Sequence, residues 1–159
     1  MVEVTPHELR EAEKRERDVL RVLTLTQPWA TLMLLGLKTI ETRSWGVKYR
    51  GPVAIHAAKG WNRDAEVFAV ELMQRKVLPT RELPFGQVLC VVQLHDVVEM
   101  TQEYITHEVH WMAEKEYGDY RPGRFAWLTR NLRPLKQPLD WKGGQGLRKM
   151  KLEALDGLL

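Results

Sequence analysis

The chain has 159 residues, of which 44% are hydrophobic and 28% charged, and its formal net charge is +3. This is typical of one globular domain with a buried core, and no apolar run reaches the ~18 residues that a membrane span needs. The first twenty residues are charged, unlike a secretory signal. The single cysteine, Cys90, excludes an internal disulfide and lies in an apolar run typical of a buried strand, so we expect a cytoplasmic protein.

Positive charge is concentrated in residues 121–151, which contain nine Arg or Lys residues and one acid, Asp140. This segment carries +8, and the rest of the chain sums to −5. Such a segment fits a polyanionic partner, for example a nucleic acid. It also fits a solvated basic edge of a sheet, and the sequence leaves both interpretations open.

In the first half of the chain, residues 5–19 predict a charged helix that Thr5 caps, with so few apolar positions that we expect an appendage or lid. The elements expected next are a strand over 22–26, a helix over 28–36 that Gly36 stops, and strands over 38–45 and 49–58. In the strand over 38–45, alternation places Thr39, Glu41 and Arg43 on one face.

In the second half, Asn62 caps an amphipathic helix whose expected apolar stripe is Val67, Val70, Leu72 and Met73. The remaining expected elements are a long strand over 86–100, a helix over 101–116 that Thr101 caps, strands over 124–135 and 138–146, and a helical last dozen residues. Strands and short connections dominate, which favours an α+β fold: a small mixed β-barrel with helices packed around it, rather than a doubly wound sheet.

The sequence lacks the glycine-rich phosphate loops and the nucleophile elbow of common enzyme folds. His107 and His110 have a spacing that a metal-binding helix permits, but no further ligand gathers around them, so we expect an exposed helix face and no metal or cofactor. His56 follows an apolar strand and is either a core histidine or a residue at the edge of a pocket.

One short stretch carries chemistry that suits a nucleobase. Trp29 and Trp45 flank Lys38, Glu41 and Arg43 in the sequence. An indole can stack on a base, a carboxylate can accept hydrogen bonds from an exocyclic amino group, and cations can hold a phosphate or polarise a carbonyl. The alternative is that both tryptophans are core residues and that the charges form a surface row.

The same stretch closely resembles the opening motif of the ASCH family, a strand and a Q-P-W-A helix followed by G-x-K-T-x-E-x-R-x-W. The matching positions are Gln27, Pro28, Trp29, Ala30, Gly36, Lys38, Thr39, Glu41, Arg43 and Trp45. Residues 117–127 and 143–147 are also similar to the second half of that family. The resemblance covers about residues 21–148 and implies a PUA-like β-barrel with a cleft that binds RNA or a modified nucleotide.

Some small members of the family remove an acyl group from N4-acetylcytidine with a lysine, a threonine three residues later and a downstream glutamate. Lys38 matches the lysine, but Glu41 occupies the position of the threonine. A carboxylate cannot replace a hydroxyl nucleophile simply. Catalysis by Glu41 as general base, with Lys38 as electrophile, is therefore the form that hydrolysis would take here.

We accordingly expect a charged helical extension over residues 1–20, an ASCH domain over 21–148 and a tail over 149–159. The favoured function is an RNA- or nucleotide-binding module. Its expected ligand-binding residues are Gln27, Trp29, Lys38, Glu41, Arg43, Trp45, His56, Tyr120 and Arg124. The alternatives are a hydrolase that acts on acylated cytidine or cleaves RNA, and a protein-interaction domain.

Overall fold

The structure is a computed structural model that describes residues 4–80 and 82–159. Its elements follow the predicted order: α1 (Pro6–Arg17), β1 (Val19–Leu25), α2 (Trp29–Leu34), β2 (Ile40–Arg43), β3 (Gly51–Ala57), α3 (Arg63–Gln74), β4 (Gln87–Glu99), α4 (Gln102–Tyr104), β5 (Phe125–Asp140) and β6 (Leu147–Lys151). Three short turns of other helix types complete the set: η1 (Ile105–Val109), η2 (Lys115–Tyr117) and η3 (Leu152–Leu155). The prediction of an α+β fold is confirmed.

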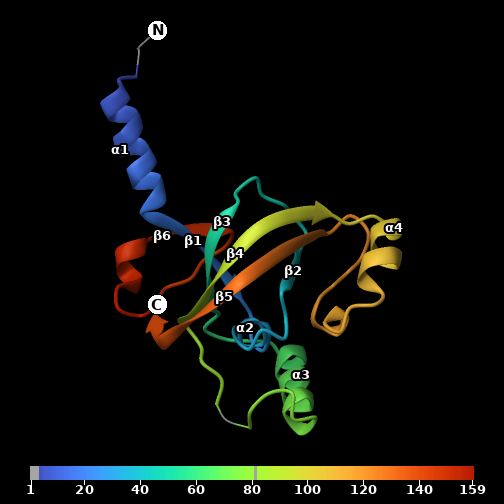
Figure 1. Ribbon diagram of the computed structural model, residues 1–159. Helices are drawn as coiled ribbons and strands as arrows, with labels where there is room; N and C mark the ends of the chain where they lie inside the picture. The colour runs from blue at the N-terminus through green and yellow to red at the C-terminus, as the bar shows by residue number, and fades with distance from the viewer. Residues whose placement is uncertain (1–3, 81) are drawn as a thin grey trace.

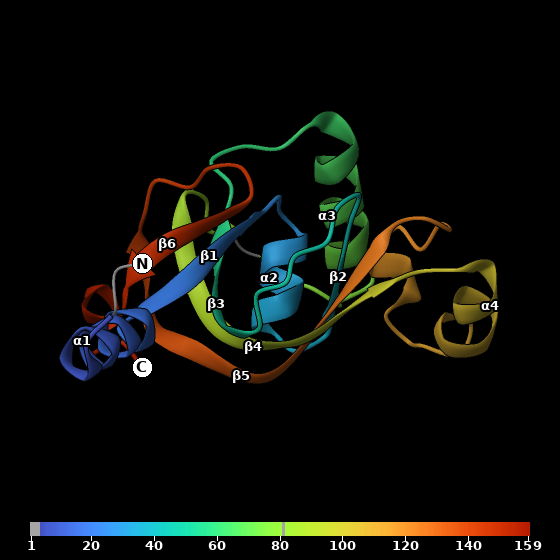
Figure 2. The same cartoon turned by 90° about the horizontal axis from the view of Figure 1, so that it is seen from above.

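The six strands form one sheet in the order β2-β5-β4-β3-β1-β6, in which only β1 and β3 run parallel. The sheet is open, because β2 and β6 are end strands that do not pair with each other, and the predicted closed barrel is not confirmed. The register between β4 and β5 shifts at three places between Val88 and Asp96. Such bulges bend strands, and seen from above the long strands curve around α2 (Figure 2).

The concave side of this curved sheet holds the main core. Ala30 and Met33 of α2 are buried there against Leu25 and Ile55 of the sheet, and Trp127 of β5 is 1% exposed in the same cluster. Helix α2 follows β1 and precedes β2 in the chain, and residues of all three elements take part in the candidate site.

Two of the predicted helices differ from their patterns. In α3, which Asn62 caps as expected, the buried residues are Ala65, Ala69 and Leu72. The predicted stripe is wrong at Val67 and Val70, which are about half exposed, because the small alanine face packs closely on the body of the protein. The predicted helix over 101–116 starts at Thr101 but is broken into α4, η1 and η2.

The C-terminal part also differs from the pattern. Pro138–Asp140 is the end of β5, and the last strand, β6, follows the glycine turn and runs across the boundary expected at residue 148. The last residues contain only the short turn η3 rather than a longer helix.

Helix α1 projects from the start of β1, away from the sheet (Figure 1). Thr5 and Glu8 form the predicted capping box, in which the Glu8 amide donates to Thr5 Oγ1 at 3.2 Å and the Thr5 amide donates to Glu8 Oε2 at 2.8 Å. None of its residues is buried. Within residues 4–80 and 82–159, every helix is too short or too polar for a membrane span.

Candidate functional site

A cavity of about 490 Å³ lies between β1 and β2, and we refer to it as the central cavity. Pairing of β6 with β1 ends at Leu23, so the last residues of β1 have a free edge that faces β2. The wall consists of Thr24, Thr26, Trp29, Glu41, Thr42, Arg43, Ser44, Trp45, Glu116, Tyr117, Gly118, Asp119 and Arg124. Five of the nine predicted site residues are among them: Trp29, Glu41, Arg43, Trp45 and Arg124.

Glu41 is the most enclosed carboxylate of this wall, with 9% of its surface exposed. Its Oε1 accepts a hydrogen bond from the Thr42 amide at 3.0 Å and lies 3.5 Å from Lys38 Nζ. Its Oε2 lies 3.4 Å from Nη2 of Arg43. Three donors therefore fix this carboxylate as a hydrogen-bond acceptor in the wall of the cavity.

Lys38 lies behind Glu41 rather than in the cavity. Its side chain is buried, and Nζ donates to the carbonyl oxygens of Ile40 at 2.5 Å and Tyr117 at 2.9 Å. Burial lowers the pKa of this ammonium, while the carboxylates of Glu41 and Glu114 oppose that shift. The lysine thus connects β2 to the segment before β5 and positions Glu41.

Arg43 connects the two sides of the cavity. Its Nη2 donates to the Thr24 carbonyl oxygen of β1 at 2.8 Å, which lies beyond the last β6 partner on that strand. Its Nε is buried without a hydrogen-bond partner among the described residues. An unpaired buried donor is unusual in a folded protein and indicates an atom that a ligand or water could use.

Trp29 and Trp45 are half-buried, and each rests on another aromatic ring. The Trp29 ring stacks on Phe68 of α3 with centroids 5.8 Å apart. The Trp45 ring meets Trp127 edge-on at 4.9 Å, and Trp127 Nε1 donates to the Trp45 carbonyl oxygen at 3.1 Å. These contacts hold both indoles in the wall. Trp29 and Trp45 are therefore packed against the core and also line the cavity, the two roles that the sequence left as alternatives.

The wall opposite β1 is formed by Arg124 and by residues 116–119, which lie a few positions before it in the chain. Arg124 Nε donates to the Asp119 carbonyl oxygen at 3.1 Å, and the Asp119 amide donates to Thr42 Oγ1 at 2.9 Å. The Asp119 carboxylate accepts two hydrogen bonds from Arg121, which lower its pKa. Glu116 is paired with Arg75 at 2.9 Å.

The structure places Gln27 and His56 in the core. Gln27 Nε2 donates to Thr31 Oγ1 and to the Pro84 carbonyl oxygen, and Gln27 Oε1 accepts from the Thr31 amide. The His56 ring is hydrogen-bonded at both nitrogens, to Thr24 and to the Trp141 carbonyl oxygen. Neither residue lines the central cavity, although His56 touches a residue that does.

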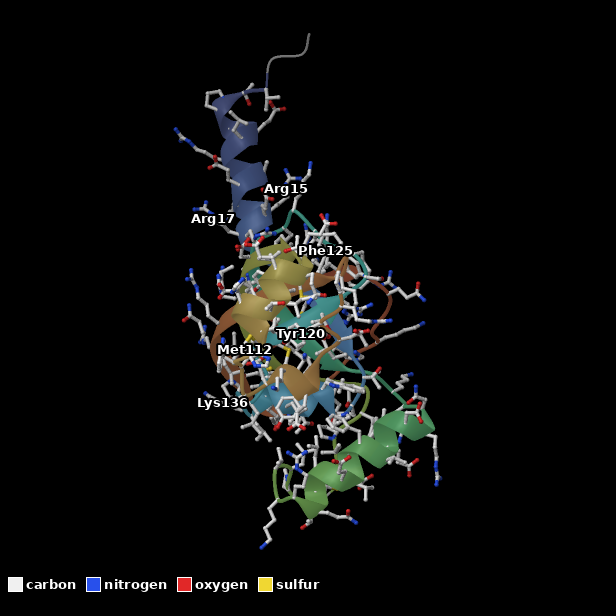
Figure 3. All side chains as sticks on the ribbon, turned by 90° about the vertical axis from the view of Figure 1, so that its right-hand side faces the viewer. Arg15, Arg17, Met112, Tyr120, Phe125 and Lys136 are labelled. Carbon is white, nitrogen blue, oxygen red and sulfur yellow. The ribbon has the colours of Figure 1, made fainter. Side chains whose placement is uncertain are left out.

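Tyr120, expected in the wall opposite Lys38, does not line the cavity either. It lies on the side of the molecule that carries α4, far from Arg15 and Arg17 of α1 (Figure 3). Its hydroxyl is buried without a hydrogen-bond partner among the described residues. Burial, reinforced by Glu114 and Glu41, raises the pKa of Tyr120.

Eight wall residues were absent from the predicted site: Thr24, Thr26, Thr42, Ser44, Glu116, Tyr117, Gly118 and Asp119. Thr24 and Thr26 lie in an ordinary strand pattern, which carries no signal of their function. Glu114 accepts hydrogen bonds from the Thr39 amide, the Ile40 amide and the Thr39 hydroxyl, each at 2.8 Å, and so holds the start of β2. The described residues contain no group of three or more His, Cys, Asp or Glu side chains that could hold a metal ion.

Comparisons with known proteins agree on one family. The family model described as "ASCH domain" matches residues 23–138. The fold is similar to the crystal structure of ASCH from Zymomonas mobilis, with a TM-score of 0.54 and 18% identity over 86% of this chain and 90% of that chain. A tyrosine-to-phenylalanine variant of that protein matches with a TM-score of 0.55 and 18% identity, covering 86% of this chain and 93% of the other. No curated protein matches the sequence significantly.

Proposed function

This chain belongs to the ASCH domain family, and from that premise we propose that it is a binding module that holds one base of an RNA or a nucleotide in the central cavity. The observation that carries the proposal is the Glu41 carboxylate, fixed by Lys38 and Arg43 in a wall shared with Trp29 and Trp45. A fixed acceptor beside aromatic rings suits a flat ligand with an amino group at its edge.

The size of the cavity agrees with such a ligand. Its volume of about 490 Å³ falls in the range of roughly 300–1,000 Å³ typical of sites for small molecules. Burying one base between such walls would contribute on the order of 1–3 kcal/mol through stacking alone.

The charges of the wall favour the base over the phosphate as the buried group. The charged side chains that line the cavity are three acids, Glu41, Glu116 and Asp119, and two arginines, Arg43 and Arg124. The lining therefore offers no surplus positive charge. We assign the phosphates to the exposed cations of β5 and β6: Arg130, Arg133, Lys136, Arg148, Lys149 and Lys151.

Three finer expectations belong to the same proposal. Leu135 of β5 and Met150 of β6 lie in one apolar cluster although their strands do not pair, because the sheet curves and brings them together. This curvature of the sheet supports a PUA-like relationship. Residues 21–148 would be the binding domain, with α1 as its appendage. The cytoplasm would be its location.

Hydrolysis of an acylated cytidine or of RNA, with Glu41 as general base, is the alternative function. A base must accept a proton in the reaction. The Glu41 oxygens are already engaged by Lys38, Arg43 and the Thr42 amide, which fits a permanent acceptor better. The alternative is therefore kept as an outcome of the experiment below.

The test is a tryptophan-fluorescence titration with nucleosides and short RNAs at low and high salt, with product analysis of each mixture. We expect quenching without a new product. The Glu41→Gln variant should bind about 10- to 100-fold more weakly, since it loses a charged acceptor worth roughly 1.5–3 kcal/mol. Trp111→Phe is the matched control, because Trp111 is 83% exposed and outside the cavity.

Other results would redirect the assignment. RNA affinity that does not fall with salt would contradict phosphate binding by the basic strands. A cleaved or deacylated product that disappears in Glu41→Gln would establish the hydrolase instead. Binding of a peptide without competition from any nucleoside would establish a protein-interaction domain.

A further inference from the structure

A second hollow lies where α1 meets the sheet, and we refer to it as the junction groove. Its volume is about 350 Å³, and its lining residues are Ala12, Arg15, Glu16, Val19, Arg21, Tyr49 and Lys149. The family model covers residues 23–138, so Tyr49 is the only one of these lining residues that it includes. The junction groove is therefore a feature that this chain adds to its ASCH domain.

The backbone around the junction groove is fixed by the sheet. Arg21 of β1 pairs with Lys149 of the neighbouring strand β6. Beyond the end of this pairing, the Leu152 amide donates to the carbonyl oxygen of Asp18, the residue that ends α1, at 2.8 Å. Because only Asp18 separates α1 from β1, the last turn of the helix stays beside Arg21 and Lys149.

The last turn of α1 contributes a third cation to the groove. Ala12, Arg15 and Glu16 are three and four residues apart, so they share the face of the helix that lines the groove. Arg15 and Arg17 point to different sides of the helix (Figure 3), and Arg17 does not line the groove. Arg15 is therefore placed there by its position on the helix, not by the general charge of α1.

Arg21 is held in the wall of the groove by an aromatic ring. Its guanidinium carbon lies 5.0 Å from the centroid of the Tyr49 ring, and the Tyr49 hydroxyl donates to the Pro52 carbonyl oxygen at 2.8 Å. A cation–π contact positions a guanidinium but leaves its positive charge and its N–H donors available. Arg21 can therefore bind an anion without first giving up a carboxylate.

The chain does not neutralise the cations of the groove. Three cations, Arg15, Arg21 and Lys149, line it together with one carboxylate, Glu16, which gives the lining a net charge of +2. Among the described residues, no ion pair within 4.0 Å includes any of the three cations. Arg21 and Lys149 are direct cross-strand partners, and like charges in that position destabilise a sheet. An anion from outside the chain would remove this repulsion.

Ordinary structural roles account for two of these cations but not for the third. A cation in the last turn of a helix is favoured by the helix dipole, which explains Arg15. A lysine on an edge strand such as β6 discourages pairing with other chains, which explains Lys149. Arg21 lies on β1, between β3 and β6, where neither reason applies. Arg21 is hence the residue that indicates a ligand.

The junction groove is close enough to the central cavity for one ligand to reach both. Trp45 lines the cavity, and Tyr49 lines the groove. Four residues of extended chain span at most about 14 Å, which is therefore the upper limit for the distance between their Cα atoms. The lining of the cavity has no surplus positive charge, whereas that of the groove has. A polyanion with one buried base would therefore place its phosphate in the groove.

We propose that the junction groove binds a backbone phosphate of the RNA strand whose base occupies the central cavity, so that α1 is part of the RNA-binding surface. The inference rests on the proposed function for the identity of the ligand, and on Arg15, Arg21 and Lys149 for the site. Phosphate contacts position a nucleic acid without reading its sequence. The groove thus adds affinity for any RNA sequence, while Glu41 and the two tryptophans select the base.

The test is a fluorescence-anisotropy titration of a fluorescein-labelled single-stranded RNA of mixed sequence with the full chain, repeated over a range of KCl concentrations. Arg21→Gln should weaken binding about 2- to 10-fold, the scale of one lost hydrogen-bonded contact. The slope of log affinity against log salt should become shallower by about 0.7, the value for one phosphate of a single strand. Arg15→Gln should act in the same direction. Arg17→Gln, the matched control on the same turn of α1, should leave both quantities nearly unchanged.

A titration with nucleosides separates this proposal from the proposed function. A nucleoside has no phosphate, so Arg21→Gln should bind it as the wild type does. If nucleosides bind but Arg21→Gln keeps the RNA affinity and salt slope of the wild type, the junction groove is overturned and the proposed function stands. If nucleosides do not bind but Arg21→Gln weakens RNA binding, the groove is a phosphate site and the central cavity does not hold a base.

Thermal unfolding of each variant shows whether it folds. Lys149 is exposed, so Lys149→Gln, with the same expected loss, decides if Arg21→Gln does not fold. Equal losses of RNA affinity in Arg15→Gln and Arg17→Gln would overturn the proposal, because the general charge of α1 would then explain both. Poly-glutamate that displaces the labelled RNA as well as unlabelled RNA does would indicate a site for acidic proteins and would also overturn it.

Discussion

Arg43 Nη2 donates a hydrogen bond to the Thr24 carbonyl oxygen at 2.8 Å and so joins two strands that do not pair in the sheet. The contact is possible because β6 pairs with β1 only as far as Leu23, which leaves the next carbonyl free. One side chain thus bridges the open side of the curved sheet, and the central cavity lies beneath this bridge.

Arg43→Lys should weaken the bridge, since an ammonium lacks the planar fork that reaches both Glu41 and Thr24. We expect a loss of about 1–2 kcal/mol in the free energy of unfolding, measured by urea denaturation. Arg63→Lys is the control, because Arg63 is exposed and should change stability by less than about 0.5 kcal/mol. Equal effects of the two substitutions would show that the bridge is not structural.

Lys38→Met should be strongly destabilising, because it leaves the carbonyl oxygens of Ile40 and Tyr117 without their donor and removes a cation from Glu41. The expected cost in the free energy of unfolding is about 3–5 kcal/mol, measured by urea denaturation. Lys48→Met, a change of an exposed lysine, should stay within about 0.5 kcal/mol of the wild type. A stable Lys38→Met protein would mean that this lysine does not hold the cavity wall together.

Because of Cys90, we expect the stability of the folded protein to fall at alkaline pH. Burial raises the pKa of its thiol from 9.0 to about 12. Above pH 9.0 the unfolded thiol ionises while the folded one does not, so the stability that Cys90 contributes decreases as the pH rises between these two values. Between about pH 8 and about pH 10, the wild type should lose roughly 1.4 kcal/mol more than Cys90→Ala. Urea denaturation at both pH values measures this difference, and parallel losses would contradict it.

Glu114→Gln should loosen the start of β2. The carboxylate accepts from the Thr39 and Ile40 amides and from the Thr39 hydroxyl, and glutamine keeps an oxygen for the two amides but loses the negative charge that strengthens these hydrogen bonds. We expect a loss of about 1–3 kcal/mol and faster hydrogen exchange at these two amides. Glu108→Gln, an exposed change nearby, should leave their exchange as in the wild type.

Gly143→Ala should destabilise the protein because the new methyl group would lie 2.5 Å from the His56 ring and Thr24 Oγ1. Overpacking of this kind costs about 1–3 kcal/mol, which thermal and urea unfolding can detect. At Gly60 a Cβ would meet no atom within 4 Å, so Gly60→Ala is the matched control. If both alanine variants were equally stable, the close packing around Thr24 and His56 would be wrong.

The order of elements could be predicted because the local signals are strong. Thr5, Asn62 and Thr101 each cap the helix they were expected to cap, through side-chain oxygens that accept backbone amide hydrogens. The buried face of α3 could not be predicted, since Val67 and Ala69 both fit an amphipathic pattern and only the distance to neighbouring side chains selects the smaller one.

The candidate site was predictable where its residues are consecutive. Glu41 and Arg43 alternate along β2, Trp45 follows just after the strand, and all three reach the same cavity. Lys38 lies outside this alternation, and its side chain turns away from the cavity to donate hydrogen bonds to the carbonyl oxygens of Ile40 and Tyr117. Thr24 joins the site from a distant strand, and the curvature that brings it there depends on bulges and on α2, which alternation alone does not reveal.

Helix α1 and the sheet domain should unfold separately, each with its own free energy of unfolding. Twelve residues are near the lower limit at which an isolated helix persists in water, and α1 has its capping box but no buried side chain to support it. It should therefore open and close as a local unit, at a free energy far below that of global unfolding. Heating or added salt would change its helical content long before the sheet, the central cavity or Thr24 responded.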